Sequence, residues 1–282
     1  MIFEKKLYDL RRKESISQEK FADILLFILY SFMIPLACIV IMENISFCKE
    51  GIANLLLYGL EGASPAVAAI ILNCQSGGKK NLSKFLKSRY KKNLDWRLCC
   101  IAFLVPAVLL TIAKLITYLT PYHNQFLTIP SAKKLLIILW ALVAEELGWR
   151  GYLQQKVNKR LSNTLTPLIV GVIWSLWHYH FWISGTMEVP IVLFIYGCIA
   201  ESYGYYVITD LSGENVVPAS IWHFSGNLFF NLYLLNPNWN SGSILPYVIA
   251  SMSYSLCIVI FIFYQKLGWS DLAGKRKKYI NC

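Results

Sequence analysis

Two acids, Glu145 and Glu146, lie side by side in an apolar stretch of the sequence, and Arg150 follows one helical turn later. At 100° per residue, Arg150 lies about 40° round a helix from Glu146 and about 140° from Glu145. We expect Glu146 and Arg150 to pair, because opposite charges four residues apart are neighbours on a helix surface. Glu145 points elsewhere and remains free to accept a proton.

Two histidines occur in similar apolar surroundings. His178 ends the segment WSLWH and lies one turn after Trp174, whose ring can pack beside the imidazole. His223 begins the segment HFSGN and shares a helical face with Asn227, four residues further on. These three segments contribute polar groups that an apolar helix does not need for packing.

A carboxylate, two imidazoles and an amide are sufficient to hydrolyse a peptide bond without a covalent intermediate. A carboxylate with an imidazole can activate water as a general base, and a second imidazole with an amide can stabilise the developing oxyanion. Two histidines and one glutamate can also hold a catalytic zinc ion, but the H-E-x-x-H spacing of zinc peptidases is absent. We therefore favour a reaction without a cofactor, and keep as the alternative a Zn²⁺ ion held by Glu145, His178 and His223.

The elements that must position these groups are membrane-spanning helices. Only 15% of the residues are charged, against about 25% in a typical soluble domain. A helix needs about 20 mainly apolar residues to cross a bilayer. The sequence predicts an all-α, polytopic transmembrane bundle of about eight helices, over 22–43, 52–74, 97–118, 134–156, 164–183, 188–209, 216–234 and 244–265.

The positive charges set the expected topology. Lys and Arg collect in cytoplasmic loops, and on the eight-helix alternation one side holds all of the 27 except Lys49, Lys114, Lys133 and Lys134. Both termini are therefore expected in the cytoplasm of a multi-pass cell-membrane protein. The expected divisions are a cytoplasmic segment over 1–21, a transmembrane domain over 22–265 with its core motifs in 140–231, and a basic cytoplasmic tail over 266–282.

Polar groups within the spans indicate a functional site. A charged side chain at the bilayer centre costs about 2.5–3.5 kcal/mol on insertion scales, so such residues usually have a function. Glu145, His178, His223 and Asn227 all fall near the middle of their predicted spans. Two further groups have weaker claims: Glu61 has no visible partner and is expected to be structural, and His180 is expected nearer the outer interface.

The basic segment 79–97 is predicted to form an amphipathic helix that lies in the headgroup region of the membrane. Its apolar residues near helical spacing are Leu82, Phe85, Leu86 and Tyr90. The net charge of +11 is explained by membrane topology, because the sequence has no module that reads nucleic acid.

The three motifs together resemble the CAAX-protease and bacteriocin-processing (CPBP/Abi) family of intramembrane proteases, type II CAAX prenyl endopeptidases among them. The motifs are E-E-x-x-x-R, an aromatic residue four before His, and H-x-x-x-N, and the Gly-Ala-Ser-Pro stretch at 62–65 is similar to the family's second helix. The family usually has Phe where this chain has Trp174. The resemblance covers roughly 50–240 and implies an intramembrane peptide hydrolase, either a metalloprotease or a metal-independent glutamate protease.

The resemblance also implies roles for individual residues. Water activation falls to Glu145 and His178, and the oxyanion site to His223 and Asn227. Structural support comes from Glu146, Arg150 and Trp174.

The leading hypothesis is an intramembrane endopeptidase that cuts a membrane-associated peptide or protein close to the cytoplasmic leaflet. Prenylated tails, bacteriocin leaders and signalling peptides are all candidate substrates. Two alternatives stay open: a non-catalytic immunity or regulatory protein of the same fold that binds a peptide partner, and a proton-coupled transporter, since intramembrane Glu and His also form proton relays.

Overall fold

The computed structural model contains helices joined by loops, and no strands, over the residues it describes, which are 2–91, 94–121, 125–240 and 242–267. Side chains are described from residue 21 onward. The predicted tail lies outside these residues, apart from its first two positions.

The elements in chain order are α1 (Ile2–Asn44), η1 (Ser46–Cys48), α2 (Gly51–Tyr90), α3 (Trp96–Tyr118), α4 (Ala132–Ala144), α5 (Glu146–Gly148), η2 (Trp149–Leu153), α6 (Gln154–Asn158), α7 (Leu165–Trp177), α8 (Tyr179–Ile183), α9 (Ile191–Leu211), α10 (Val217–Leu232), η3 (Pro237–Trp239) and α11 (Leu245–Lys266).

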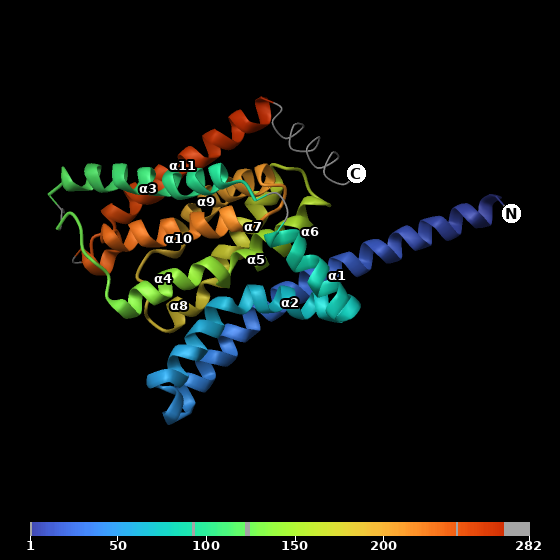
Figure 1. Cartoon of the computed structure of the whole chain (residues 1–282), viewed down its shortest axis with the longest axis horizontal. Helices are drawn as coiled ribbons and strands as arrows, with labels where there is room; N and C mark the ends of the chain where they lie inside the picture. The colour runs from blue at the N-terminus through green and yellow to red at the C-terminus, as the bar shows by residue number, and fades with distance from the viewer. Residues whose placement is uncertain (1, 92–93, 122–124, 241, 268–282) are drawn as a thin grey trace.

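Each of the eight predicted spans coincides with helix in the structure (Figure 1). Within the described residues, five helices are long and apolar enough to cross a membrane: α1, α2, α3, α9 and α11. The other three predicted spans are short or interrupted. The span 134–156 is divided into α4, α5, η2 and α6, the span 164–183 is divided into α7 and α8, and α10 is a single shorter helix.

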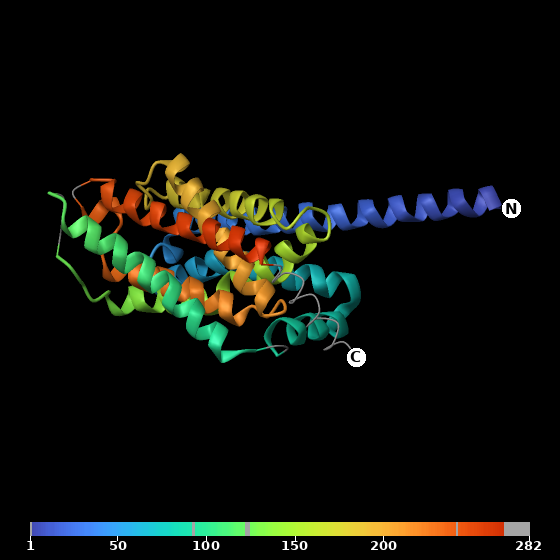
Figure 2. The same cartoon turned by 90° about the horizontal axis from the view of Figure 1, so that it is seen from above.

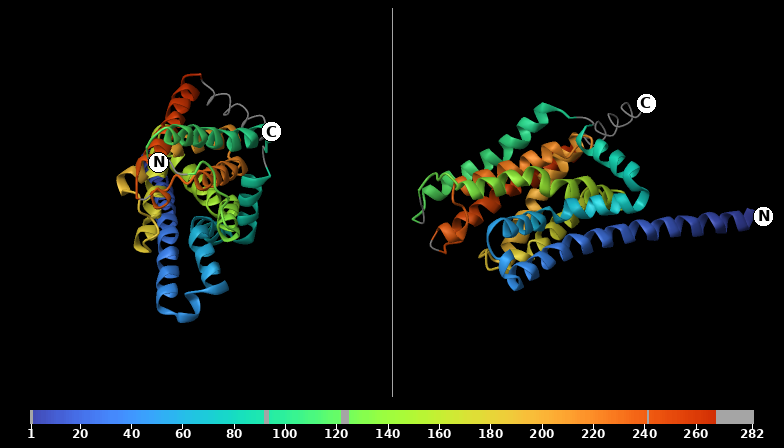
Figure 3. Two further views of the ribbon diagram at one scale, coloured as in Figure 1. Left: turned by 90° about the vertical axis from the view of Figure 1, so that its left-hand side faces the viewer. Right: turned by 60° about the horizontal axis from the view of Figure 1, so that its bottom comes forward.

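The helices pack in pairs around a buried core. Helix α1 packs along α2, α10 along α3, α11 along α9, and α7 along α9. Figure 2 shows α1 as a long helix whose N-terminal part extends beyond the bundle, so helix begins well before the predicted residue 22. Figure 3 shows α1 and α2 as a pair on one side of the other helices.

A buried polar contact ties the α1–α2 pair to α7. The indole Nε1 of Trp177 donates to the carbonyl oxygen of Ser31 at 2.9 Å and to Oγ of Ser64 at 3.0 Å. Ser64 in turn donates to the same Ser31 carbonyl at 2.9 Å. A polar group in an apolar interior is costly unless it is hydrogen-bonded, so these contacts specify how the three helices meet.

Close backbone approach fixes α5 against α2. A Cβ atom added at Gly148 would lie 2.4 Å from the carbonyl carbon and oxygen of Pro65, far inside van der Waals contact. Only glycine allows the two helices to come this near. This contact places the Glu145–Glu146 pair against the kinked helix that contains Pro65.

The basic segment is helical up to Tyr90 and continues α2 after a bend at Gly77 and Gly78. Gly78 has φ +62°, a backbone conformation that glycine adopts at no steric cost. The predicted apolar residues are partly buried and the lysines are exposed, as an amphipathic helix requires. The apolar set is Leu82, Phe85, Leu86 and Tyr90, and the described lysines are Lys79, Lys80, Lys84, Lys87 and Lys91.

Candidate active site

The predicted site begins where α4 ends. Glu145 interrupts the helix with φ −113° and ψ −43°, and the chain then winds through α5 into a π-helix over η2. A π-helix widens the turn to an i→i+5 hydrogen bond and often occurs at functional sites. The uninterrupted helix predicted over 134–156 is therefore wrong at this point.

Glu146 and Arg150 form the predicted ion pair. Arg150 Nη1 lies 3.2 Å from Glu146 Oε2, and both side chains are fully buried. The guanidinium also lies over two aromatic rings, 3.8 Å from the centroid of Tyr205 and 4.6 Å from that of Trp174. Such cation–π contacts stabilise a desolvated cation.

Glu145 faces away from Arg150, as predicted, and is held by two indoles. Its Oε2 accepts hydrogen bonds from Trp174 Nε1 at 3.0 Å and from Trp149 Nε1 at 3.2 Å. Its Oε1 lies 3.8 Å from His223 Nε2. One carboxylate oxygen is therefore fixed by neutral donors, and the other faces an imidazole.

His223 lies between the two glutamates. Its Nδ1 is 2.8 Å from Glu146 Oε1, while its Nε2 faces Glu145. The ionised Glu146 can only accept, so Nδ1–H donates to it. The prediction that Glu146 serves Arg150 alone is thus incomplete, because the same carboxylate also orients His223.

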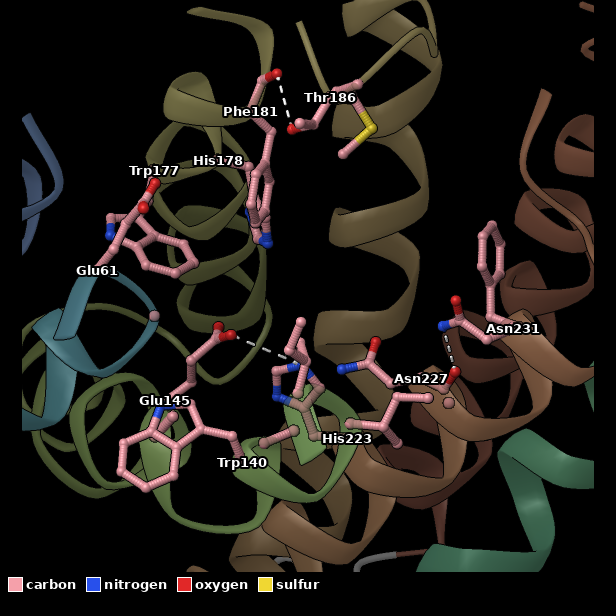
Figure 4. Close-up of a pocket in the computed structure, with 18 of the residues that line it drawn as sticks. Glu61, Trp140, Glu145, Trp177, His178, Phe181, Thr186, His223, Asn227 and Asn231 are labelled. Carbon is pink, nitrogen blue, oxygen red and sulfur yellow. Dashed lines mark hydrogen bonds and ion pairs between the residues drawn. The ribbon is translucent and has the colours of Figure 1, made fainter. Parts of the chain in front are cut away.

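His178 caps the end of α7 and begins α8. Its Nδ1–H donates to the Trp174 carbonyl oxygen at 2.8 Å, which leaves Nε2 as the free ring nitrogen. The Trp174 and His178 rings meet edge to face at 5.6 Å, as the four-residue spacing predicts. Figure 4 shows His178 and His223 on either side of the Glu145 carboxylate.

One cavity of about 910 Å³ brings the four predicted groups together. Figure 4 shows Asn227 beside His223 in its wall, and Asn231 donates to the Asn227 carbonyl oxygen at 2.7 Å. The lining includes Glu145, His178, His223 and Asn227. The cavity can hold a peptide segment against a carboxylate, two imidazoles and an amide.

Comparison with known proteins gives two similarities. Residues 127–257 match the family model described as type II CAAX prenyl endopeptidase Rce1-like. The matched residues are called here the Rce1-like segment, and they make up less than half of the chain. CAAX prenyl protease 2 of Methanococcus maripaludis is similar, with 42% identity over 45 residues that cover 16% of this chain and 17% of that protein. The aligned stretch thus spans less than a fifth of the relative's length.

The match confirms the family resemblance that the motifs predict, and all four cavity residues lie inside the Rce1-like segment. With five helices apolar enough to span a bilayer, the chain is a multi-pass membrane protein.

The structure does not gather the predicted zinc ligands into a ready metal site. Within the described residues, no three His, Cys, Asp or Glu side chains are placed to hold a metal ion. His178 Nε2 is free for a ligand, and Glu145 Oε1 lies 3.8 Å from His223 Nε2. The Zn²⁺ ion held by Glu145, His178 and His223 therefore stays a prediction.

The structure gives contacts to two residues outside the three motifs. His180 is fully buried in the protein, with Nδ1–H donating to the Trp177 carbonyl oxygen at 2.8 Å, and its depth in the membrane stays a prediction. Glu61 has a partner, because His180 Nε2 lies 3.3 Å from its Oε1. The pair joins α2 to α8 and also lines the cavity.

Glu201 on α9 also lines the cavity and was missed by the sequence analysis. The signal was available, because this acid falls near the middle of the predicted span 188–209. The criterion that selected Glu61, an unexplained charge in an apolar span, applies equally to Glu201.

Proposed function

We propose that the chain is an intramembrane endopeptidase that hydrolyses a peptide bond in a membrane-associated peptide or protein. The observation that carries the proposal is the position of His223 between Glu145 and Glu146, in the wall of a cavity that His178 and Asn227 also line. The Rce1-like match supports the same class of reaction.

Glu145 is the proposed general base. Its Oε1 is not one of the hydrogen-bonded atoms held by the two indoles, so it can take a proton from water as the water oxygen attacks the peptide carbonyl carbon. His178 presents its free Nε2 to the cavity and orients the same water. Glu145 then passes the proton to the leaving nitrogen as the carbon–nitrogen bond breaks.

His223 and Asn227 are the proposed oxyanion donors. The Glu146 carboxylate fixes the imidazole through Nδ1–H and stabilises its doubly protonated form, in which Nε2–H can donate to the oxyanion. A buried acid has the same effect on histidine in hydrolytic triads. Donors placed in advance around the developing charge contribute much of the rate acceleration in such sites.

The proposed substrate is a peptide segment that enters the cavity from the bilayer, in a protein of the cell membrane. Apolar side chains make up most of the wall, among them Leu55, Ile137, Met187, Phe194 and Phe230. Prenylated tails, bacteriocin leaders and signalling peptides all present an apolar segment beside a peptide bond, so each belongs in the first substrate screen.

The decisive variant is Glu145→Gln, which keeps the size of the side chain and removes the base. Purified full-length protein in detergent should hydrolyse a degenerate peptide library, with the products identified by mass spectrometry. Loss of a general base typically lowers the rate about 10²–10⁴-fold. Glu188→Gln is the matched control, because Glu188 is exposed in the α8–α9 loop and does not line the cavity. Full proteolysis by Glu145→Gln refutes the proposal.

The metal-free form of the reaction has a separate test. Hydrolysis should persist after dialysis against a strong chelator, with metal content checked by elemental analysis. Activity that disappears on chelation and returns with Zn²⁺ would support the zinc alternative instead.

A further inference from the structure

Glu201 is a carboxylate in the cavity wall that the proposed reaction does not use. It projects from α9 and is partly exposed, and its Oε1 accepts a hydrogen bond from Trp222 Nε1 at 3.1 Å. Trp222 immediately precedes His223. The carboxylate is therefore coupled through one indole to the helix that contains the proposed oxyanion donors.

Glu201 has no basic side chain within ion-pair distance in the described part of the chain, where no Lys, Arg or His nitrogen lies within 4.0 Å of it. The other three acids of the site each have a basic nitrogen within that distance. These contacts are Glu61 with His180, Glu145 with His223 and Glu146 with Arg150.

An unpaired carboxylate at this depth is costly. A charge near the bilayer centre is disfavoured by about 2.5–3.5 kcal/mol even on insertion scales, which is why such groups pair or serve a ligand. A structural carboxylate would have its counter-ion within the chain. The missing counter-ion of Glu201 is therefore best supplied by whatever enters the cavity.

Glu201 faces the cavity beside a residue that lacks a side chain. Gly226 on α10 also lines the cavity, and a Cβ atom there would already lie 3.5 Å from Glu201 Oε1 and 3.2 Å from the Tyr254 hydroxyl oxygen, so only glycine leaves this side of the carboxylate uncovered. Gly197, one turn before Glu201 on α9, and Ser251 on α11 line the same side of the cavity. The opening is adjacent to Asn227, so a side chain bound there flanks the bond that is cut.

We propose that Glu201 selects the substrate by binding a lysine or arginine side chain next to the scissile bond. The inference rests on the proposed peptide hydrolysis and narrows its substrate to apolar segments with one basic residue. The basic side chain supplies the counter-charge that the protein lacks, and Trp222 holds the carboxylate in position. Glu201 takes no part in the bond-breaking step.

The test uses full-length protein in detergent and a peptide from the library, a cleaved one where the digest shows cleavage and an apolar one where it shows none. Matched peptides carry Lys, norleucine or Glu at each of the positions flanking the cut. For the wild type, we expect kcat/KM to be on the order of 10- to 100-fold higher with Lys than with norleucine at one position. Glu201→Gln, which keeps an acceptor for Trp222, should abolish the preference, and Glu201→Lys should shift it toward Glu.

Binding provides a readout that does not depend on hydrolysis. The same peptides are titrated against the Glu145→Gln protein, alone and combined with Glu201→Gln, and followed by tryptophan fluorescence. Lys-selective binding that Glu201→Gln removes, without hydrolysis by the wild type, refutes the proposed function and keeps the subsite. The subsite is refuted if Lys changes neither binding nor cleavage, or if the preference for Lys persists in the Glu201→Gln protein. Either result leaves the proposed function intact.

Discussion

Glu146→Leu is expected to destabilise the protein strongly, because it leaves the Arg150 guanidinium buried without its carboxylate. Both side chains are fully buried, and Arg150 Nη1 lies 3.2 Å from Glu146 Oε2. Among the residues that the structure describes, Arg150 Nε and Nη2 already lack hydrogen-bond partners, so the lost contact has no substitute there. Breaking a buried pair by removing one member costs about 3–5 kcal/mol, which raises the unfolding equilibrium constant by two to more than three orders of magnitude.

The second variant separates stability from catalysis. Glu146→Leu combined with Arg150→Met removes both charges, and replacing a whole buried pair by apolar residues is often neutral or stabilising. We expect most of the lost stability to return. Hydrolysis should stay low, because His223 Nδ1 still lacks the acceptor that lies 2.8 Å away in the structure.

The assay is reversible unfolding in mixed micelles, followed by circular dichroism as the denaturing detergent fraction increases, with peptide hydrolysis measured on the same samples. The control is Asp23→Leu, which breaks the partly exposed pair of Asp23 with Lys156 and should cost about 0–1 kcal/mol. A Glu146→Leu protein as stable as the control, or a double variant no more stable than the single one, would refute the reasoning.

Three further predictions concern other contacts of the site. Gly148→Ala should cost about 1–3 kcal/mol in the same unfolding assay, because its Cβ would lie 2.4 Å from the α2 backbone. Glu61→Leu should cost about 1–3 kcal/mol, because it leaves the buried His180 without its carboxylate partner. Trp174→Phe should lower kcat about 10-fold with little change in KM, since one of the two indoles that hold Glu145 is lost.

Each of these three has a contrary outcome. Gly62→Ala is the control for the first, since its Cβ would meet nothing nearer than 3.8 Å; equal effects of the two changes contradict the close-approach argument. If the Glu61→Leu protein is as stable as the wild type, the contact between Glu61 and His180 makes no net contribution to the free energy of unfolding. A rise in KM alone for Trp174→Phe would place the indole in substrate binding rather than beside the base.

Local sequence patterns predicted the helices and the pair that depends on one helix. The eight spans follow from apolar length, and the Glu146–Arg150 pair follows from spacing within a turn. Both properties are set by residues close in the chain. The same reasoning failed at Glu145, where the helix is interrupted and then widens into a π-helix, because close packing against α2 through Gly148 overrides helical continuity.

Contacts between helices could not be predicted from one sequence. The bond from His223 to Glu146, the Trp174 indole donor on Glu145 and the pairing of Glu61 with His180 all join residues from different elements. Their existence depends on which helix faces meet and at what depth. Hydropathy determines neither which helix faces meet nor the depth at which they meet.

By itself, the sequence determined that the protein is a helical membrane bundle and which polar residues its apolar spans contain, because span length and the cost of buried charge are local properties. The three motifs also predicted the resemblance to the Rce1-like family model. Only the tertiary structure decided that Glu146 holds both Arg150 and His223, and that Glu201 has no cationic partner among the described residues. Those facts depend on the distances between side chains of separate helices, which packing sets and sequence spacing does not.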